Sequence, residues 1–250
     1  MLDSLFDKYN FDYIFHLAAV SSVQDSIENP ELTHRINFDA TLSLLEKAMN
    51  LRRLKRFIYA STAAVYGDEP HLPCREDRPV NPMSPYGVDK YASERYVLIW
   101  NNLFGVPATV FRFFNVYGPR QNPTSPYSGV ISIFAERILK GEKDVRIFGD
   151  GQQTRDFIYV KDVVDAVLFT IKLENSRGKV YNLGTGRDVS LIELIKNLEQ
   201  VTGRKIDIDY REERQGDIRH SCSDISALKN LGYNGEFRDI LGGLKELLEY

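Results

Sequence analysis

Cysteine, clustered histidine and long hydrophobic runs are what this chain has little of. Its 250 residues include two cysteines, Cys74 and Cys222, which form no Cys-x-x-Cys pair, so the sequence predicts no disulfide framework. No two of the four histidines have ligand spacing on one predicted face, and we therefore predict no metal site. No apolar run reaches about 18 residues and no basic-then-apolar leader opens the chain. We therefore expect no membrane span, no secretion signal and a location in the reducing cytoplasm.

An excess of positive charge is also missing. The 32 basic and 35 acidic residues give a net charge of −3, which provides no basic field for nucleic acid. The apolar share of 43% is ordinary for a globular protein. An anionic substrate would therefore be held by a few placed arginines, and a chain of this length can form one large or two modest domains.

The apolar pattern alternates between short strands and longer helices. The first part of the chain predicts strands at residues 13–17, 56–59 and 108–113 and helices at residues 31–50 and 86–104. Alternation of this kind predicts a doubly wound parallel α/β sheet covered by helices. After Val116 the texture changes to a Pro-rich stretch and then to a smaller α/β part. We expect two domains, residues 1–116 and 117–250, the second closing over the carboxyl edge of the sheet.

The most informative stretch runs from Tyr86 to Lys90. It places a phenol and an ammonium four residues apart on one face of a predicted helix, and Thr62 supplies a hydroxyl at the end of the preceding strand. A tyrosine beside a fixed cation can lose its proton far below its usual pKa of about 10. Such a group can take the proton of a substrate alcohol while a nicotinamide takes its hydride. A Tyr-x-x-x-Lys pair alone is most often a pair of surface neighbours, so the assignment depends on the motifs around it.

Seven segments occur in the order of one known family. They are His16-Leu17-Ala18-Ala19, Ser61-Thr62 with Val65-Tyr66-Gly67, Ser84-Pro85-Tyr86 with Lys90, Arg112 to Pro119, Gly149-Asp150-Gly151 with Arg155-Asp156-Phe157, Tyr181 to Gly186, and Gly216-Asp217. Through these segments the chain resembles the extended short-chain dehydrogenase/reductases, specifically the NAD-dependent nucleotide-sugar epimerases and dehydratases. The resemblance is closest to UDP-glucose and UDP-N-acetylglucosamine 4-epimerases. It implies a Rossmann-like fold, NAD as cofactor, a UDP-sugar as substrate and an isomerase activity.

The glycine-rich opening of that family has no counterpart in this chain. Family members begin with a strand and a Gly-x-x-Gly-x-x-Gly loop that binds the NAD pyrophosphate. This chain begins with a predicted amphipathic helix at residues 1–6, so we expect on the order of 60 residues, about two βαβ units, to be missing. The run from Gly184 to Val189 is a weak substitute because its sixth position is not glycine. We interpret it as a turn before a helix, with Ser190 as N-cap and Glu193 completing a capping box.

The resemblance implies a role for each candidate site residue. Thr62, Tyr86 and Lys90 would be catalytic, with Tyr86 as the acid/base and Lys90 lowering its pKa and holding the nicotinamide ribose. The cofactor would be contacted by Ala18, Ser61, Tyr86, Lys90 and Phe113. The nucleotide sugar would be contacted by Ser21, Ser22, Asn115, Arg155, Arg214, Asp217 and Ser221. The two arginines would bind the diphosphate through bidentate hydrogen bonds, and the small Ser221 would admit an N-acetyl group without excluding a hydroxyl.

Ala63 and Ala64 narrow the reaction that the resemblance allows. Dehydratases of this fold carry an Asp-Glu pair at these positions and decarboxylases a Glu in the second, whereas methyl groups move no protons. We therefore expect oxidation and reduction at one carbon, as in 4-epimerisation. A related nucleotide-sugar dehydratase or reductase remains an alternative, as does a non-catalytic sugar-nucleotide-binding remnant without the glycine-rich loop. The resemblance also implies a homodimer formed through helices 31–50 and 86–104.

Overall fold

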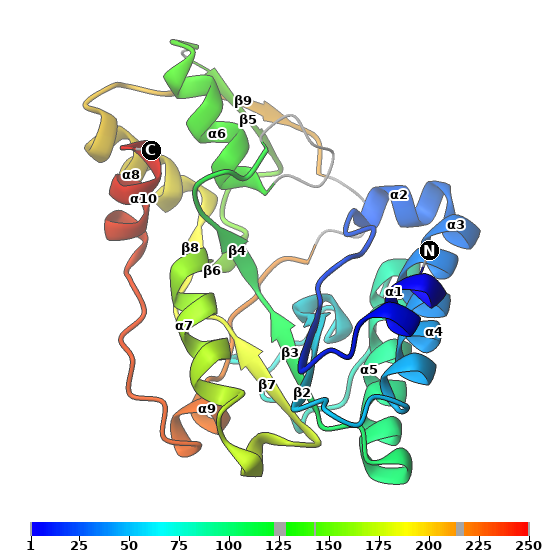
Figure 1. The fold of residues 1–250 in the computed structure, drawn as a ribbon. Coiled ribbons are helices and arrows are strands. Elements are labelled where there is room, and N and C mark those ends of the chain that lie inside the picture. Colours follow the sequence, from blue (N-terminus) through cyan, green and yellow to red (C-terminus); the bar gives the residue numbers. More distant parts are fainter. Residues whose placement is uncertain (1, 123–128, 143, 214–217, 250) are drawn as a thin grey trace. The chain divides into compact units, whose positions relative to one another are not determined.

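The computed structural model describes residues 2–122, 129–142, 144–213 and 218–249. The chain forms two compact units, each assembled from three segments. The first unit contains Met1–Gly67, Glu76–Phe113 and Leu168–Asn182. The second unit contains Asp68–Arg75, Phe114–Val167 and Leu183–Tyr250. The helices and strands of both units are labelled in Figure 1.

The first unit is built on a four-stranded sheet with the strand order β1-β2-β3-β7. Its strands are β1 (Tyr13–His16), β2 (Arg56–Thr62), β3 (Ala108–Phe113) and β7 (Lys179–Leu183). Strands β1, β2 and β3 run parallel, and Ser61 lies opposite Arg112 in the register of β2 and β3. Strands β2 and β3 are buried over almost their full length, as is usual for parallel strands that are covered on both faces. The predicted parallel α/β fold is thus confirmed.

The helices of the first unit include the one that carries Tyr86 and Lys90. They are α1 (Leu2–Lys8), α2 (Val23–Glu28), α3 (Pro30–His34), α4 (Ala40–Ala48) and α5 (Pro85–Phe104). Helices α4 and α5 pack on one side of the sheet, where Leu45 and Val97 join Phe57 of β2 in a buried cluster (Figure 1). Helix α1 is tied to α4 by an ion pair between Asp3 and Lys47.

The helix predicted at residues 31–50 is not one regular α-helix. A π-helical turn, Arg35–Asp39, separates α3 from α4, and Asn37 lies within it with 1% of its surface exposed. The Asn37 amide bonds both backbone groups of Val20, accepting from its nitrogen at 2.8 Å and donating to its oxygen at 2.9 Å. The wide turn therefore accompanies a polar side chain that is directed inward rather than to solvent.

His16, at the end of β1, is buried and has a side-chain partner. Its Nε2 lies 2.8 Å from Oγ1 of Thr41, which in turn donates to the backbone oxygen of Asn37 at 2.6 Å. Burial, followed by the nearby charge of Lys90, lowers the pKa of His16 to about 4. The ring is therefore neutral at neutral pH.

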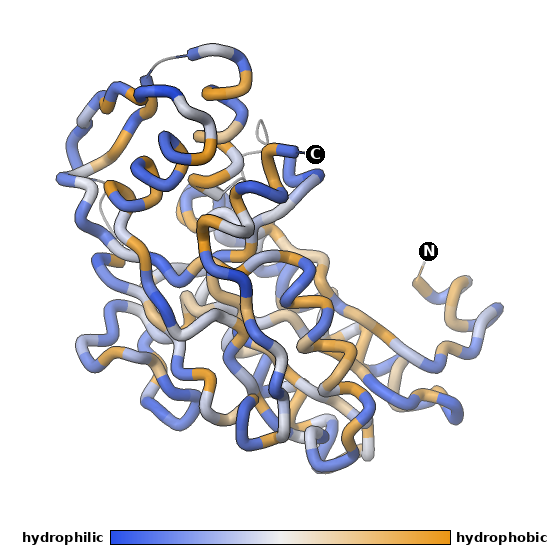
Figure 2. The backbone as a smooth tube through the Cα atoms, turned by 90° about the vertical axis from the view of Figure 1, so that its left-hand side faces the viewer, coloured by the Kyte–Doolittle hydropathy of each residue, from blue (hydrophilic) through white to orange (hydrophobic). Residues whose placement is uncertain are grey.

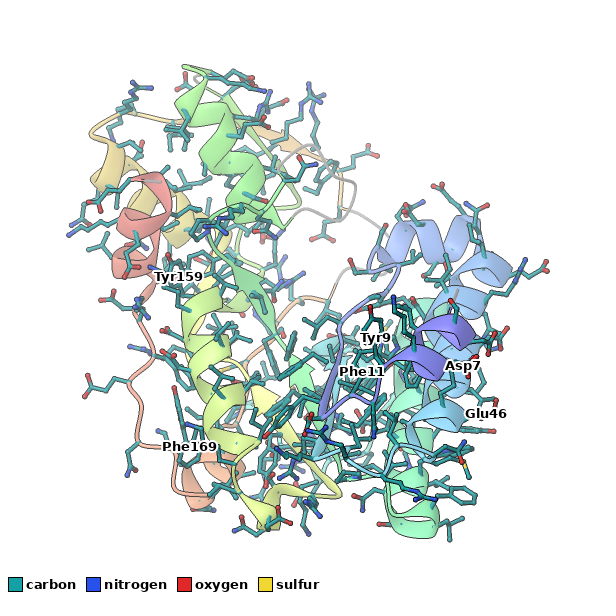
Figure 3. The ribbon with its side chains drawn as sticks, in the orientation of Figure 1. Asp7, Tyr9, Phe11, Glu46, Tyr159 and Phe169 are labelled. Atoms are coloured by element: carbon teal, nitrogen blue, oxygen red, sulfur yellow. The ribbon has the colours of Figure 1, made fainter. Side chains whose placement is uncertain are left out.

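The second unit contains two small sheets. Strands β4 (Asn115–Tyr117), β6 (Thr154–Tyr159) and β8 (Asp188–Ser190) form one, and β5 (Asp144–Phe148) pairs with β9 (Asp207–Arg211) in parallel to form the other. Its helices are α6 (Val130–Leu139), α8 (Leu191–Thr202), α9 (Ser226–Asn230) and α10 (Ile240–Leu248), while α7 (Val160–Thr170) begins here and ends in the first unit. Tyr159 of β6 is labelled in Figure 3; its ring packs 5.5 Å from that of Tyr117 and 5.1 Å from the guanidinium carbon of Arg238.

The start of α8 confirms a local prediction. The hydroxyl of Ser190 accepts from the backbone nitrogen of Glu193 at 3.1 Å, and the Glu193 carboxylate accepts from the backbone nitrogen of Ser190 at 3.0 Å. This is the predicted capping box. The Gly-Thr-Gly segment lies between β7 and β8, and β8 leads directly into α8.

No helix among the described residues is long and apolar enough to cross a membrane. In Figure 2 the hydrophobic stretches of the chain are short and are interrupted by hydrophilic residues.

Candidate active site

Helix α5 brings Tyr86 and Lys90 into the interior of the first unit. The helix begins at Ser84, whose hydroxyl accepts from the Gly87 nitrogen at 3.1 Å, and ends at Gly105, which has a left-handed backbone with φ of 70°. These signals fix the first turn, in which Tyr86 lies. Tyr86 and Lys90 are 9% and 3% exposed, so they are not the surface pair that such spacing usually produces.

Thr62 and Tyr86 meet in the first unit. Thr62 is the last residue of β2, and its Oγ1 accepts from the Ala64 nitrogen at 3.2 Å, which caps the short 3₁₀ helix Ala63–Val65. The Thr62 hydroxyl also lies close enough to the Tyr86 phenol to lower its pKa. The strand end and the first turn of α5 thus bring together the hydroxyl and the phenol that the sequence predicted as partners.

The electrostatics of this pair differ from our expectation. Burial raises the pKa of Tyr86, and the nearby Thr62 hydroxyl only partly opposes it. The net shift is opposite to the lowering expected from Lys90, because desolvation penalises the phenolate. Burial also lowers the pKa of Lys90 to about 7, and its ammonium nitrogen lies 4.5 Å from the ring centre of Tyr59. Lys90 is therefore only partly charged at neutral pH.

The loop after β1 carries three of the predicted contact residues. Ala18 and Ser21 are exposed, and the hydroxyl of Ser22 accepts from the Asp25 nitrogen at 3.0 Å as the N-cap of α2. The same loop is fixed at Val20 by Asn37, a residue that sequence reasoning missed. The signal that could have found it is an amide within the apolar pattern of the helix predicted at 31–50.

Ser61 has a buried partner that sequence reasoning missed, and its predicted contact with the cofactor stays a prediction. It is 3% exposed, and its hydroxyl donates to the carboxylate of Glu94 on α5 at 2.8 Å. The same carboxylate pairs with Arg112 of β3, at 2.7 Å from Nη2 and 3.1 Å from Nε. The Ser61 hydroxyl thus donates to the carboxylate of a buried ion pair. Phe113, half-buried, follows Arg112 at the end of β3.

The second unit holds the remaining described candidates. Asn115 opens β4, Arg155 lies in β6 and donates to the Thr154 backbone oxygen at 2.8 Å, and Ser221 is half-buried outside helices and strands. Arg214 and Asp217 lie outside the described residues. The joint binding of a sugar nucleotide by Asn115, Arg155 and Ser221 stays a prediction.

Asp156 organises the segments near Arg155 and Ser221. Its fully buried carboxylate accepts from the backbone nitrogen and hydroxyl of Thr185 at 2.7 and 2.8 Å and from the Gly186 nitrogen at 3.0 Å. It also accepts from the nitrogen and hydroxyl of Ser223 at 3.0 and 2.5 Å. A Cβ at Gly184 would lie 2.6 Å from this carboxylate, so glycine is required there by close approach. The Asp of the Arg155-Asp156-Phe157 motif therefore fixes the backbone around the predicted sugar-nucleotide contacts.

Comparison with known proteins identifies the family of the chain. A sequence model of the NAD dependent epimerase/dehydratase family matches residues 1–184. The chain belongs to this family. Over 242 residues it is 36% identical to a UDP-glucose 4-epimerase of Mycolicibacterium smegmatis, covering 96% of this chain and 73% of the relative.

Solved structures extend the likeness to the fold. A UDP-glucose 4-epimerase of Thermotoga maritima with UDP-glucose is 39% identical and superposes with a TM-score of 0.93, covering 100% of this chain and 80% of the other. A UDP-glucuronic acid 4-epimerase of Bacillus cereus in complex with UDP-glucuronic acid and NAD is 29% identical, with a TM-score of 0.90 over 100% of this chain and 77% of the other.

Membership of this NAD-dependent family makes NAD the cofactor. The phenol of Tyr86, the ammonium of Lys90 and the hydroxyl of Thr62 are the donor set that a nicotinamide ribose and a reacting alcohol require, so the residues present in the first unit fit it. The described residues contain no group of three or more His, Cys, Asp or Glu side chains able to hold a metal ion.

Proposed function

We propose that this epimerase/dehydratase-family chain inverts C4 of a UDP-hexose, either UDP-glucose and UDP-galactose or their N-acetyl forms, through a 4-keto intermediate. The observation that carries the proposal is the burial of Tyr86 and Lys90 on one face of α5, with the Thr62 hydroxyl close enough to the phenol to lower its pKa. NAD, held by residues of the first unit, would supply reversible hydride transfer at C4 with no net change of the cofactor. The protein's own task is to bind and orient the sugar and to move one proton.

Each catalytic side chain has one part in this reaction. Tyr86 takes the proton of the C4 hydroxyl at its phenol oxygen and gives it back after the sugar has rotated. Thr62 orients that hydroxyl through its own hydroxyl. Lys90 holds the nicotinamide ribose, and its charge favours the phenolate as substrate and cofactor displace water.

The neighbours of Thr62 favour epimerisation over elimination. Ala63 and Ala64 form the short helix that Thr62 caps, and neither carries a group that can move a proton. A dehydratase or decarboxylase of this fold would need an acid there. Oxidation and reduction at one carbon need none.

The residues of the second unit supply the proposed specificity. Asn115, Arg155, Arg214 and Asp217 would hold the UDP group, with the arginines on the diphosphate. Ser221 would face the 2-substituent of the sugar, where a small side chain leaves room for an N-acetyl group. If so, Ser221→Tyr lowers kcat/KM for UDP-N-acetylglucosamine relative to UDP-glucose by about 10-fold or more, and an unchanged ratio would contradict the assignment.

The two parts of the chain are proposed to bind different ligands. Residues 1–116 would bind NAD, with Ala18, Ser61 and Phe113 as further contacts, and residues 117–250 would mainly bind the sugar nucleotide. Ser61 would act through the strand end, since its described partner is Glu94. The cytoplasm is the proposed compartment.

We also propose a homodimer through helices 31–50 and 86–104. Aromatic rings join these helices: Phe38 packs edge to face against Tyr96 at 5.1 Å, and Tyr96 stacks on Trp100 of the same helix at 5.5 Å. Leu103, beside them on α5, is 72% exposed, so an apolar surface is present to be covered. Leu103→Glu should shift the protein from dimer to monomer in light scattering, and an unaltered mass would reject this interface.

The test of the function is substitution of the acid/base. Tyr86→Phe keeps the buried ring but removes the proton-transfer group, so kcat for UDP-glucose to UDP-galactose conversion with NAD should fall by about 100-fold or more. Tyr96→Phe is the matched control, because it makes the same change about 2.8 helical turns away on α5. Turnover of Tyr86→Phe within a few-fold of the original would exclude the proposed acid/base. Binding of UDP-sugars without any conversion would favour the sugar-nucleotide-binding remnant.

A further inference from the structure

A buried ion pair joins α5 to the two strands beside it. Glu94 of α5 and Arg112 of β3 are 1% and 4% exposed, and the guanidinium bonds both carboxylate oxygens through Nη2 at 2.7 Å and Nε at 3.1 Å. Ser61 of β2 donates to the same carboxylate at 2.8 Å. One carboxylate therefore holds two neighbouring strands and a helix at the same level.

The contacts of Glu94 lie in register with the catalytic residues on both the helix and the strand. Tyr86, Lys90 and Glu94 follow one another at intervals of four along α5, so they share a face of the helix. Ser61 directly precedes Thr62, and Ser61 and Arg112 are opposite each other in the register of β2 and β3. A slide or rotation of α5 on the sheet would therefore change the Glu94 contacts and the Tyr86–Thr62 contact together.

Further contacts fix the orientation of the Arg112 guanidinium in this ion pair. The guanidinium carbon of Arg112 lies 4.8 Å from the ring centre of Tyr66, and its Nη1 donates to the backbone oxygen of Glu76 at 3.2 Å. Tyr66 donates to Oδ1 of Asn182 at 2.7 Å, and Oε1 of Glu76 accepts from the Asn182 backbone nitrogen at 2.7 Å. Arg112 thus has a fixed direction, and a fork-shaped cation with a fixed direction tolerates few positions of its carboxylate.

Stability alone is a weak reason for such a pair. Burying two charges costs their hydration free energy, and the attraction between them hardly exceeds that cost. Apolar side chains of similar size in the same place are often as stabilising. A bidentate contact does, however, restrict geometry more than apolar packing does. Small errors in the position of a reacting group are costly, since a displacement of about 1 Å can lower a rate about 100-fold.

We propose that Glu94, Arg112 and Ser61 are positioning residues that set the location of Tyr86 against Thr62. The kinetic part of this inference rests on the proposed epimerase function, whereas its structural part does not. Loss of the pair should therefore alter the surroundings of the Tyr86 phenol even when the protein remains folded.

The experiment combines NMR with kinetics on the full chain. The protein is labelled with [ζ-¹³C]tyrosine, and the Tyr86 resonance is identified by its loss in Tyr86→Phe. Glu94→Gln keeps the shape of the side chain but removes the charge-assisted fork. It should shift the Tyr86 resonance and lower kcat about 10-fold or more with KM changed less than about twofold. Arg112→Lys, which keeps the charge but not the fork, should do the same.

A second buried arginine provides the matched control. Arg56, at the start of β2, is 1% exposed and donates from Nη2 to the backbone oxygens of Ile171 and Leu173 at 3.0 Å each. Arg56→Lys should lower the unfolding midpoint but leave kcat and the Tyr86 resonance unchanged. If it shifts that resonance as much as Glu94→Gln does, the effect is a general loosening of the unit and the proposal fails.

Other outcomes separate positioning from structure and from the proposed function. If Glu94→Gln lowers only the unfolding midpoint, with kcat and the Tyr86 resonance unchanged, the pair is structural and the proposal is overturned. If Glu94→Gln does not fold, Ser61→Ala removes one hydroxyl only and should give a smaller shift of the same resonance, while no shift would overturn the proposal. If the unaltered chain converts no UDP-hexose, the proposed function fails, and the resonance shift alone decides the positioning role.

Discussion

The two units of this protein each bury a carboxylate, and they neutralise it in different ways. In the first unit Glu94 accepts from Arg112 and from one hydroxyl, so a full positive charge lies against it. In the second unit the described donors to Asp156 are neutral, three backbone nitrogens and two hydroxyls. The first arrangement ties a helix to strands through side chains, and the second fixes loops through their backbone.

The difference indicates what each carboxylate controls. A guanidinium fork determines the direction of one side chain, as needed for a catalytic residue on a helix. A set of backbone donors determines the path of the chain, as needed at a turn such as Thr185-Gly186. Lys90 is a third case, a buried cation whose pKa is lowered to about 7, so that it gives up its charge more readily than an exposed lysine does.

The largest effect should come from removing the carboxylate of the second unit. Asp156→Ala removes the acceptor of the buried Thr185 and Ser223 backbone nitrogens and of the Ser223 hydroxyl, at about 1–3 kcal/mol for each unsatisfied group. We expect the free energy of unfolding to fall by at least about 4 kcal/mol in urea titrations.

The control for this prediction is a carboxylate of the same unit. Asp150 is more than half exposed and pairs with Arg219 at 2.6 Å. Asp150→Ala should cost less than about 1 kcal/mol, because an exposed ion pair contributes little. Equal losses for the two variants would mean that the neutral donor set around Asp156 has no special importance.

A smaller effect, with a characteristic pH dependence, is expected from Lys90. The unfolded chain protonates this lysine below its ordinary pKa of 10.5, whereas the folded chain does so only below about 7. Between these pH values the unfolded state binds more protons, so the free energy of unfolding should rise with pH, by about 1.4 kcal/mol per pH unit for this group. Lys90→Met should remove that part of the slope.

Urea midpoints at pH 7.5 and 9.5 measure the slope directly. The rise seen in the unaltered chain should be roughly 2–3 kcal/mol larger than in Lys90→Met. Lys196 of α8 is exposed, and Lys196→Met should leave the slope as it is. A slope that is the same in all three proteins would show that Lys90 keeps its charge. The contrast between Glu94, which faces a guanidinium, and Lys90, whose pKa is lowered by burial, would then disappear.

Local features of the fold could be predicted from the sequence. The limits of α5 follow from Ser84 and Gly105, and the start of α8 follows from Ser190 and Glu193, because each signal acts within one helical turn. The Tyr86 and Lys90 spacing also predicted a shared helix face, and burial of both side chains agrees with a role in a site.

Features that depend on distant partners could not be predicted in the same way. Asp156 and Ser223 are 67 residues apart, and Ser61 and Glu94 are 33 apart. Single-chain patterns contain no signal for such pairs, so the Glu94 partner of Ser61 was missed and β6 was not predicted at all. The sign of the Tyr86 pKa shift was wrong for a related reason, since desolvation depends on all atoms packed around the phenol.

The smallest expected effect compares the helix caps of the two units. The Ser84 hydroxyl caps α5 by accepting from the Gly87 nitrogen, and Gly87 has no side chain that could complete a capping box. Ser190 of the second unit forms a complete capping box with Glu193. Ser190→Ala removes the acceptor for the Glu193 nitrogen and also one donor to its carboxylate, and should cost about 1–2 kcal/mol. Ser84→Ala should cost about 1 kcal/mol or less in stability.

The activity of the two cap variants should rank in the opposite order. Ser84 fixes the turn that contains Tyr86, so Ser84→Ala should lower kcat several-fold, while Ser190→Ala leaves kcat nearly unchanged at temperatures where the protein is folded. Urea unfolding and initial rates measured on the same preparations test both rankings. If the less stable variant is also the less active one, the first turn of α5 is held by packing rather than by its cap, and precise placement of Tyr86 must come from Glu94 and Arg112 alone.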